Sequence, residues 1–371
     1  MNVPPYWSGL ARRLSPYIPG EQPGDKKFIK LNTNENPYPP SPAVIEAIRR
    51  AAGEKLRLYP DPSCTIMREA AAKRWGLKPE QIFCGNGSDE ILAFAFAAFF
   101  ACPGSAESKE PVLFPNITYS FYPVYAALWN IPFRAMPLGK DFSINIEDYK
   151  QRSCGVIFPN PNAPTGRALD REALSEIAVF QEKNKKVFIV DEAYIAFAEG
   201  KNIGTMIPFI NDHPNMLVVR TLSKDASLAG LRSGYAIGSG ELIEGLCRIR
   251  DSFNSYTVDR LAQSASAAAI ADISYYDNIN RRICKTRKRT AEALSDMGFT
   301  VIPSEANFIF ASPPSPVRAA EYLAQLRQRG ILIRHFNKPE IENYLRISIG
   351  ADDDMDIFLS ACKEITEKRP A

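Results

Sequence analysis

Lys224 follows a short apolar run, residues 216–219, and a polar turn that contains Thr221 and Ser223. The run predicts a buried strand, so we expect Lys224 just beyond a strand end. A lysine there usually decorates a surface, but small and apolar residues surround this one, and Arg232 lies eight residues on. In such a setting a lysine amine can lose its proton and attack a carbonyl, while hydroxyls and a guanidinium bind an anion. Taken alone, the segment is equally compatible with an ordinary loop.

A second segment favours the chemical interpretation. Residues 187–190 predict a buried parallel strand that ends at Asp191, and Tyr194 follows three residues later. Open α/β sheets bind ligands at the carboxyl ends of their strands. An aspartate there can pair with a protonated ring nitrogen, and a tyrosine can bond a ring oxygen. With a nucleophilic lysine and an anion-binding arginine, these are the groups that pyridoxal phosphate requires.

With these segments the sequence resembles a known family, the fold type I pyridoxal-phosphate aminotransferases, in the branch of the histidinol-phosphate aminotransferases. The resemblance is close to full length, from LNTNENP at residues 31–37 to LRISIG at residues 345–350. It implies an α/β fold: a large domain with a mostly parallel sheet flanked by helices, plus a smaller α+β domain. Its motifs are specific for the cofactor and less specific for the substrate.

The elements that must position these residues suggest three parts. Residues 1–30 are rich in proline and glycine and predict an N-terminal arm. Residues 31–272 would form the large cofactor-binding domain. A composition shift near Ile273 marks a small C-terminal domain, residues 273–371, with the predicted order strand, strand, helix, strand, strand, helix.

A glycine loop in the large domain is a candidate anion site. Residues 82–84 predict a strand, GNGSD follows at residues 85–89, and a long apolar helix is expected over residues 91–101. Free N–H groups and the helix dipole attract a phosphate in this arrangement. The signal is weak alone, because the spacing matches neither the P-loop nor the dinucleotide fingerprint. Together with Ser223 and Arg232, it favours a single phosphate monoester.

The residues and the resemblance together give a set of expected site residues. The expected catalytic residues are Lys224, Asp191 and Tyr194. The expected cofactor contacts are these three with Gly87, Ser88, Asp89, Tyr119, Asn162, Thr221, Ser223, Arg232 and, from a partner subunit, Tyr59. The expected substrate contacts are Tyr17, Asn34, Tyr256, Arg334 and Arg346. No metal site is expected.

Several of these roles follow from the resemblance. Tyr119 would stack on the pyridine ring, and Tyr59 would cross a homodimer interface to the partner's cofactor phosphate. Arg334 would hold the phosphate of the substrate. Two arginines that face a cleft can also clamp an anion, and we expect Arg346 to hold an α-carboxylate by a bidentate fork.

The sequence departs from the family pattern at Ala163. The family usually has an asparagine immediately before Pro-Thr-Gly, and that side chain bonds the ring oxygen. Alanine cannot make this bond. Asn162 is the nearest substitute and Asn160 the next.

Composition bounds the remaining possibilities. The 371 residues are 45% apolar and 23% charged, with a net charge of +3, so nothing points to nucleic acid or a membrane surface. Two histidines exclude a multi-histidine metal site. The seven cysteines are widely spread, as expected of small buried side chains in a reducing compartment, and no signal peptide is evident. These features favour a cytoplasmic protein.

The resemblance implies transamination of L-histidinol phosphate with 2-oxoglutarate, which gives imidazole acetol phosphate and glutamate in histidine biosynthesis. An aromatic or broad amino-acid aminotransferase would use the same cofactor residues. A threonine-phosphate decarboxylase of the same branch would instead release carbon dioxide. A binding protein or regulator without catalytic activity would leave Lys224 idle.

Overall fold

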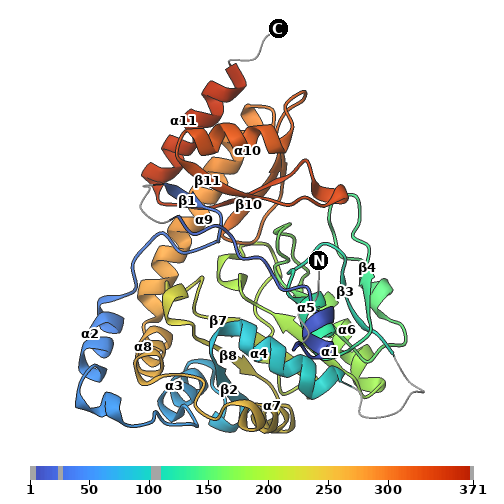
Figure 1. Cartoon of the computed structure of the whole chain (residues 1–371), viewed down its shortest axis with the longest axis vertical. Coiled ribbons are helices and arrows are strands. Elements are labelled where there is room, and N and C mark those ends of the chain that lie inside the picture. Colours follow the sequence, from blue (N-terminus) through green and yellow to red (C-terminus); the bar gives the residue numbers. More distant parts are fainter. Residues whose placement is uncertain (1–5, 24–27, 102–109, 368–371) are drawn as a thin grey trace.

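The computed structural model describes residues 6–23, 28–101 and 110–367. Figure 1 shows a larger lobe at the bottom, built around one sheet, and a smaller lobe at the top that contains the C-terminal helices α10 (Ala319–Gln328) and α11 (Asp352–Glu367). No helix within these ranges combines the length and the apolar character that a membrane crossing requires.

The sheet of the larger lobe has seven strands in the order β2-β8-β7-β6-β5-β3-β4. Only β8 runs antiparallel to its neighbours, so the carboxyl ends of the other strands meet at one edge. The mostly parallel α/β architecture expected from the sequence is confirmed. The strands are β2 (Ile82–Gly85), β3 (Val112–Pro115), β4 (Phe133–Met136), β5 (Gly155–Pro159), β6 (Val187–Asp191), β7 (Met216–Thr221) and β8 (Gly234–Ile237).

Both faces of this sheet are covered, which explains why its central strands are continuous apolar runs. Successive residues of a strand point to opposite faces. On β6, Phe188 and Val190 join one buried cluster, whereas Ile189 joins another. The first cluster is completed by α2 (Pro42–Ala51), α3 (Thr65–Trp75), α6 (Arg171–Lys183) and α8 (Arg260–Ala271), and the second by α4 (Gly87–Ala95), α5 (Tyr122–Leu128) and α7 (Gly240–Phe253).

The sheet of the smaller lobe has five strands in the order β1-β11-β12-β10-β9. They are β1 (Ile29–Leu31), β9 (Thr300–Ile302), β10 (Phe308–Ser312), β11 (Ile331–His335) and β12 (Leu345–Ser348). The order of elements from β9 to α11 matches the sequence expectation. However, β1 pairs in parallel with β11, Ile29 opposite Ile331, so the expected limit between arm and large domain falls inside a strand of the small lobe.

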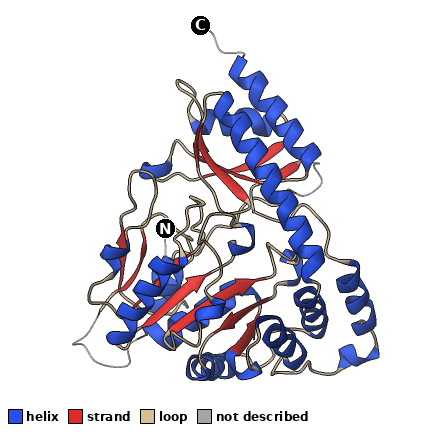
Figure 2. Cartoon of the chain, turned by 180° about the vertical axis from the view of Figure 1, so that it is seen from behind, coloured by secondary structure: helices blue, strands red, loops and turns tan. Residues whose placement is uncertain are grey.

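One helix, α9 (Ile273–Asp296), connects the two lobes, as Figure 2 shows from behind. Tyr276 and Ile279 near its start belong to a core cluster of the large lobe. Ile283 and Cys284, one turn later, belong to the core of the small lobe. Because a single rigid helix contributes to both cores, the lobes are held at a defined separation, and the space between them can be a binding site.

Two elements near the expected site start at different residues than the sequence pattern predicts. Helix α4 already begins at Gly87 and continues as a π-helical turn, Phe96–Phe100. The motif Thr118-Tyr119-Ser120 predicts a helix start at Thr118, but helix α5 begins at Tyr122, so Tyr119 lies in the loop that follows β3. Within the arm, a short helix α1 (Gly9–Arg13) is capped by Ser8.

Candidate active site

A cavity of about 290 Å³ lies between the lobes, at the carboxyl edge of the large sheet. Its floor includes Pro159, Asp191 and Thr221, which are the last residues of β5, β6 and β7. The small lobe contributes Arg334 from β11 and Arg346 from β12. The topology therefore places the cavity where open α/β sheets usually bind ligands.

Most of the residues expected from the sequence line this cavity, although they are scattered from the arm to β12. The exceptions are Gly87, Asn162, Tyr59 and Tyr256. Those that line it are Tyr17, Asn34, Ser88, Asp89, Tyr119, Asp191, Tyr194, Thr221, Ser223, Lys224, Arg232, Arg334 and Arg346.

The amine of Lys224 reaches into the cavity from the turn after β7. Its Nζ donates a hydrogen bond to the backbone oxygen of Thr33, at 2.9 Å. Burial of the amine, reinforced by the positive charge of Arg346, lowers the pKa of Lys224 to about 8, although Glu35 opposes the shift. An appreciable fraction of this amine is therefore neutral near physiological pH, and only the neutral form is nucleophilic.

The carboxylate of Asp191 is nearly enclosed, with 4% of the residue exposed. Oδ2 accepts a hydrogen bond from the Tyr122 hydroxyl at 3.1 Å, and Oδ1 accepts one from the Ala193 backbone N–H at 3.2 Å. Burial raises the pKa of Asp191 to about 7, against the opposing effect of these two donors. A protonated ring nitrogen in the cavity would supply the countercharge that this carboxylate lacks.

Sequence reasoning missed Tyr122, which is completely buried. Nothing in its local motif distinguishes it from other aromatic residues at a helix start. Its role depends on α5 packing beneath the end of β6, a long-range contact that a single sequence does not reveal.

The start of α4 forms a cradle for an anion. Gly87 has φ +76°, and a Cβ there would lie 3.0 Å from Arg232 Nη2, so glycine leaves the guanidinium room to approach the helix. Arg232 donates to Asp89 Oδ2 at 3.0 Å and approaches Ser223 Oγ at 3.5 Å. The cavity wall at this point combines a helix N-terminus, hydroxyls and a cation, a donor set that fits a phosphate monoester.

The small lobe contributes two arginines. Arg334 and Arg346 lie opposite each other in the pairing of β11 with β12. Arg346 Nη2 donates to the Asn32 backbone oxygen at 2.7 Å, while its buried Nε has no hydrogen-bond partner among the residues that the structure describes. Burial lowers the pKa of Arg346. Two neighbouring guanidinium groups, one with an unsatisfied buried donor, are suited to an anionic ligand.

Asn162 does not line the cavity, so the structure gives no support to the expectation that it replaces the missing amide at Ala163. Asn162 is fully buried, and its Nδ2 donates to Ile117 O at 2.9 Å and to Thr165 Oγ1 at 3.0 Å. Its Oδ1 accepts from Thr118 Oγ1. The loop turns Ala163, not its neighbour, toward the cavity.

The side chain of the second alternative, Asn160, is also hydrogen-bonded away from the cavity. Its amide bonds both the backbone oxygen and the backbone N–H of Leu169. The hydroxyl of Tyr194 lines the cavity instead and accepts a hydrogen bond from Asn34 Nδ2 at 3.0 Å. The hydroxyl proton of Tyr194 is therefore available for donation to a ligand in the cavity.

Tyr59 and Tyr256 lie on the outer surface. Their rings stack with centroids 4.6 Å apart, and they are 79% and 43% exposed. Leu58 and Phe253 are exposed apolar residues from the segments that flank them. One copy of the chain does not bring these residues to its own cavity.

The arm closes one side of the cavity. Tyr17 packs against Phe121 with ring centroids 4.3 Å apart. Four residues on, Glu21 pairs with Arg327 of α10. The arm is thus attached to the large lobe by an aromatic contact and to the small lobe by an ion pair.

The comparisons with known proteins agree with this geometry. The class I and II aminotransferase family matches residues 26–362. The chain is 47% identical, over 98% of its length and 99% of the relative, to the histidinol-phosphate aminotransferase of Clostridium botulinum. It is 48% identical to histidinol-phosphate aminotransferase 1 of Bordetella parapertussis, over 97% of this chain and 98% of the relative.

Solved structures show the same architecture. Histidinol-phosphate aminotransferase from Sinorhizobium meliloti, in complex with pyridoxal-5'-phosphate, superposes with a TM-score of 0.84 at 25% identity, over 98% of each chain. An aspartate aminotransferase from Thermus thermophilus shares the fold, with a TM-score of 0.80 at 19% identity over 97% of this chain and 99% of that one. Fold and cavity define an aminotransferase of fold type I. The chain belongs to the class I and II aminotransferase family.

Within the described residues, no group of three or more histidine, cysteine, aspartate or glutamate side chains could hold a metal ion.

We predict that Lys224 in the ligand-free protein reacts with a small acylating reagent with a midpoint near pH 8, the pKa to which burial and Arg346 lower its amine. Peptide mass spectrometry across a pH series measures the modified fraction. Arg346→Gln removes a positive charge and should move the midpoint upward, whereas Arg248→Gln on the surface should not. A midpoint at the ordinary lysine value, about 10.4, would contradict the lowered pKa.

We also predict that ligand-free Asp191→Asn gains stability over the wild-type protein as pH rises. The folded protein binds the Asp191 proton more tightly than the unfolded chain, whose aspartates titrate near about 4. The wild-type free energy of unfolding therefore falls as pH rises from about 4 through the folded pKa of about 7, and this loss is absent in the variant. Urea denaturation at several pH values measures it, with exposed Asp277→Asn as control; a gap independent of pH would refute the raised pKa.

Proposed function

We propose that the chain is a pyridoxal-phosphate-dependent histidinol-phosphate aminotransferase. It would transfer the amino group of L-histidinol phosphate to 2-oxoglutarate, which gives imidazole acetol phosphate and glutamate in histidine biosynthesis. The observation that carries the proposal is the convergence of an enclosed amine, an enclosed carboxylate and an anion cradle on one cavity. The 47% identity to a curated histidinol-phosphate aminotransferase over nearly the whole chain supports the substrate assignment.

The donor groups around the cavity fit pyridoxal phosphate. Asp191 would face the ring nitrogen, Tyr194 would bond the ring oxygen, and Tyr119 would stack on the ring. The cofactor phosphate would be held by Ser88, Asp89, Thr221, Ser223 and Arg232. When bound, the cofactor supplies an electron-accepting ring, which stabilises the negative charge left when the α-carbon of the substrate loses its proton.

The side chains of this protein supply the proton transfers and the charge balance. Lys224, with its lowered pKa, would act as the base that takes the proton from the substrate α-carbon, and would then hold this proton as the acid for the second proton transfer, to a different atom. Asp191 would stay ionised once a ring cation faces it, because an opposite charge lowers the pKa of a carboxyl. Tyr194 would donate to the ring oxygen while Asn34 fixes its hydroxyl.

Arg334 and Arg346 would serve both half-reactions. No ion pair between either side chain and a carboxylate is seen in the described part of the chain, so their charge is available to a ligand. The phosphate of histidinol phosphate and a carboxylate of 2-oxoglutarate are both oxyanions that guanidinium groups bind by paired hydrogen bonds. A donor without a phosphate would leave one of these two cations uncompensated.

We further propose that the enzyme is a homodimer with shared sites. Exposed apolar residues in the two segments around the stacked rings of Tyr59 and Tyr256 support this, because exposed apolar surface often marks an interface. In the dimer Tyr59 would reach the cofactor phosphate of the partner subunit and Tyr256 its substrate. The exposed apolar residues of these two segments are Leu56, Leu58, Tyr59, Ile66, Phe253 and Tyr256.

The homodimer predicts that mixed subunits restore activity. Tyr59→Ala and Lys224→Ala should each lose most activity alone, since each damages every site of its own dimer. When the two are mixed, one dimer in two would carry one site with both residues intact. Activity of the mixture should rise well above either parent, and a fully active monomer in sedimentation would contradict the proposal.

A cytoplasmic location remains part of the proposal. Cys64, Cys84, Cys247, Cys284 and Cys362 are free thiols, and four of these are buried. Buried free thiols are typical of proteins from reducing compartments. Cys102 lies outside the described residues.

The substrate assignment predicts a ranking of amine donors. With 2-oxoglutarate as acceptor, kcat/KM should be highest for L-histidinol phosphate and at least tenfold lower for L-phenylalanine, because only the phosphate compensates both arginines. Arg334→Ala should lower kcat/KM for the phosphorylated donor more than for phenylalanine. Lys224→Ala is the inactive control.

Other outcomes would favour the alternatives. Equal losses for both donors in Arg334→Ala would indicate an aromatic or broad aminotransferase. Release of carbon dioxide from threonine phosphate would indicate the decarboxylase. Full activity in Lys224→Ala would exclude Lys224 as the base.

A further inference from the structure

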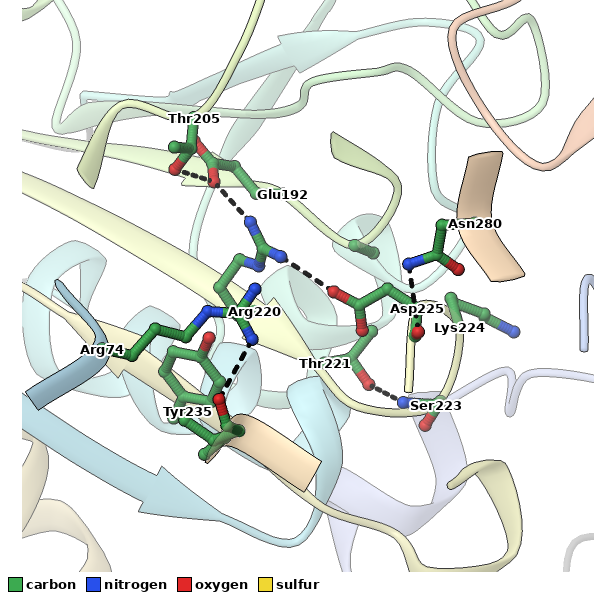
Figure 3. Close-up of polar contacts among 12 residues, drawn as sticks. Arg74, Glu192, Thr205, Arg220, Thr221, Ser223, Lys224, Asp225, Tyr235 and Asn280 are labelled. Atoms are coloured by element: carbon green, nitrogen blue, oxygen red, sulfur yellow. Dashed lines mark hydrogen bonds and ion pairs between the residues drawn. The ribbon is translucent and has the colours of Figure 1, made fainter. Parts of the chain in front are cut away.

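A buried ion triad lies behind the cavity and outside its lining. Arg220, on β7, is 4% exposed. Its Nη1 lies 3.3 Å from Glu192 Oε2, and its Nη2 lies 2.8 Å from Asp225 Oδ2. Figure 3 shows Arg220 between these two carboxylates. Glu192 directly follows Asp191, and Asp225 directly follows Lys224. One guanidinium therefore connects the residues that come immediately after the two central groups of the site.

The two carboxylates are anchored unequally. Glu192 also accepts hydrogen bonds from Thr205 Oγ1 and from the Met206 backbone N–H, both at 2.6 Å. Asp225 Oδ1 is buried and has no hydrogen-bond partner among the residues that the structure describes. Glu192, fixed by Thr205 and Met206, therefore restrains Arg220, and Arg220 in turn restrains the Asp225 side chain, which has fewer contacts of its own.

The backbone around Lys224 has two further supports. Asn280 of α9 donates to the Asp225 backbone oxygen at 3.2 Å, and Asn36 donates to the Lys224 backbone oxygen at 3.0 Å. Both asparagines bond the main chain and leave the Asp225 side chain to Arg220. The ion pair is therefore the contact that fixes this turn relative to β6.

Charge explains why the triad is stable in the interior. Burial disfavours the charged form of Arg220, but Tyr235, Asp225 and Glu192 together raise the pKa of Arg220 above its ordinary value. Burial raises the pKa of Glu192, and Arg220 opposes that shift. Because an ionised Glu192 also raises the pKa of its neighbour Asp191, the arginine shields the site from a second negative charge.

We propose that Arg220 is a positioning residue of the reaction. By tying Glu192 to Asp225 it fixes the Lys224 amine relative to the Asp191 carboxylate across the cavity. This inference rests on the proposed function for the identity of the reaction. The two ion pairs of Arg220, with Glu192 and with Asp225, are present in the cofactor-free chain. Displacement of a reacting group by about 1 Å can cost roughly 100-fold in rate, so a loosened turn should act mainly on kcat.

The test uses Asp225→Ala rather than a substitution of Arg220. Removing the arginine would leave two buried carboxylates unpaired, and such a variant is prone to unfold. Asp225→Ala keeps the ion pair between Arg220 and Glu192 and removes only the ion pair that restrains the turn containing Lys224. The matched control is Glu199→Ala, in the segment between β6 and β7 that packs against the small lobe, which removes the carboxylate 3.1 Å from another buried arginine, Arg287.

Asp225→Ala should lower kcat by roughly 10- to 100-fold while KM for both substrates changes less than about threefold. In the cofactor-free protein, hydrogen exchange should accelerate over residues 221–228 and stay unchanged in β9 and β10. The acylation midpoint of Lys224 should move upward from about 8, because a mobile amine is better hydrated. Arg220→Lys keeps the positive charge but cannot contact both carboxylates as the guanidinium does, so its kcat, hydrogen exchange and acylation midpoint should be intermediate. Glu199→Ala should match the wild type in all three measurements.

The proposal would be overturned if Asp225→Ala kept the wild-type kcat, the wild-type hydrogen-exchange rates over residues 221–228 and the wild-type acylation midpoint of Lys224. A uniform rise in hydrogen exchange across the protein would also overturn it. The exchange and acylation measurements need neither cofactor nor substrate. They decide the role of Arg220 even if the wild-type protein fails to transaminate histidinol phosphate, so the two failures can be told apart.

Discussion

The interaction on which the rest of the structure depends is the desolvation of two groups of opposite type in one cavity. Burial lowers the pKa of Lys224 and raises the pKa of Asp191, so both groups are driven toward their neutral forms near physiological pH. A cavity that only separated them from water would be unstable and inert. It would become functional if a ligand supplied a ring cation for Asp191 and a carbonyl for Lys224, because both unfavourable desolvations would then be partly offset.

This electrostatic arrangement requires that the charged groups be held in fixed positions. The large sheet positions one set of them, and the small lobe positions the other. The large sheet brings Asp191 and Thr221 to one edge because β6 and β7 are adjacent and parallel. The small lobe brings Arg334 and Arg346 to the opposite side because β11 and β12 pair antiparallel and put the two residues opposite each other. Helix α9 contributes to the cores of both lobes and so fixes how far apart these two edges lie.

The parts of this architecture that local pattern encodes could be predicted. The apolar runs of β2, β6 and β7, the glycine loop before α4 and the alternation of elements after residue 299 predicted the sheet, the anion cradle and the small lobe. Parts that depend on long-range pairing could not be predicted. The three residues of β1 carry no signal that they join β11, some 300 residues later. Tyr122 looks like any aromatic residue at a helix start, and the orientation of Asn162 depends on contacts with Ile117 and Thr118 from another loop.

The segment after β1 is part of a motif that identifies the family, but its structural role cannot be deduced from the sequence alone. Residues 32–36 run between the lobes and contact groups from both. The backbone oxygens of Asn32 and Thr33 accept from Arg346 and Lys224. Asn34 donates to Tyr194 and is itself held by Ser348 of β12. Any displacement of the small lobe would therefore be transmitted to the amine and to the tyrosine hydroxyl through these few residues. Two of these contacts are made by backbone oxygens, which any residue type can supply, so the residue types in this segment reveal only part of its role.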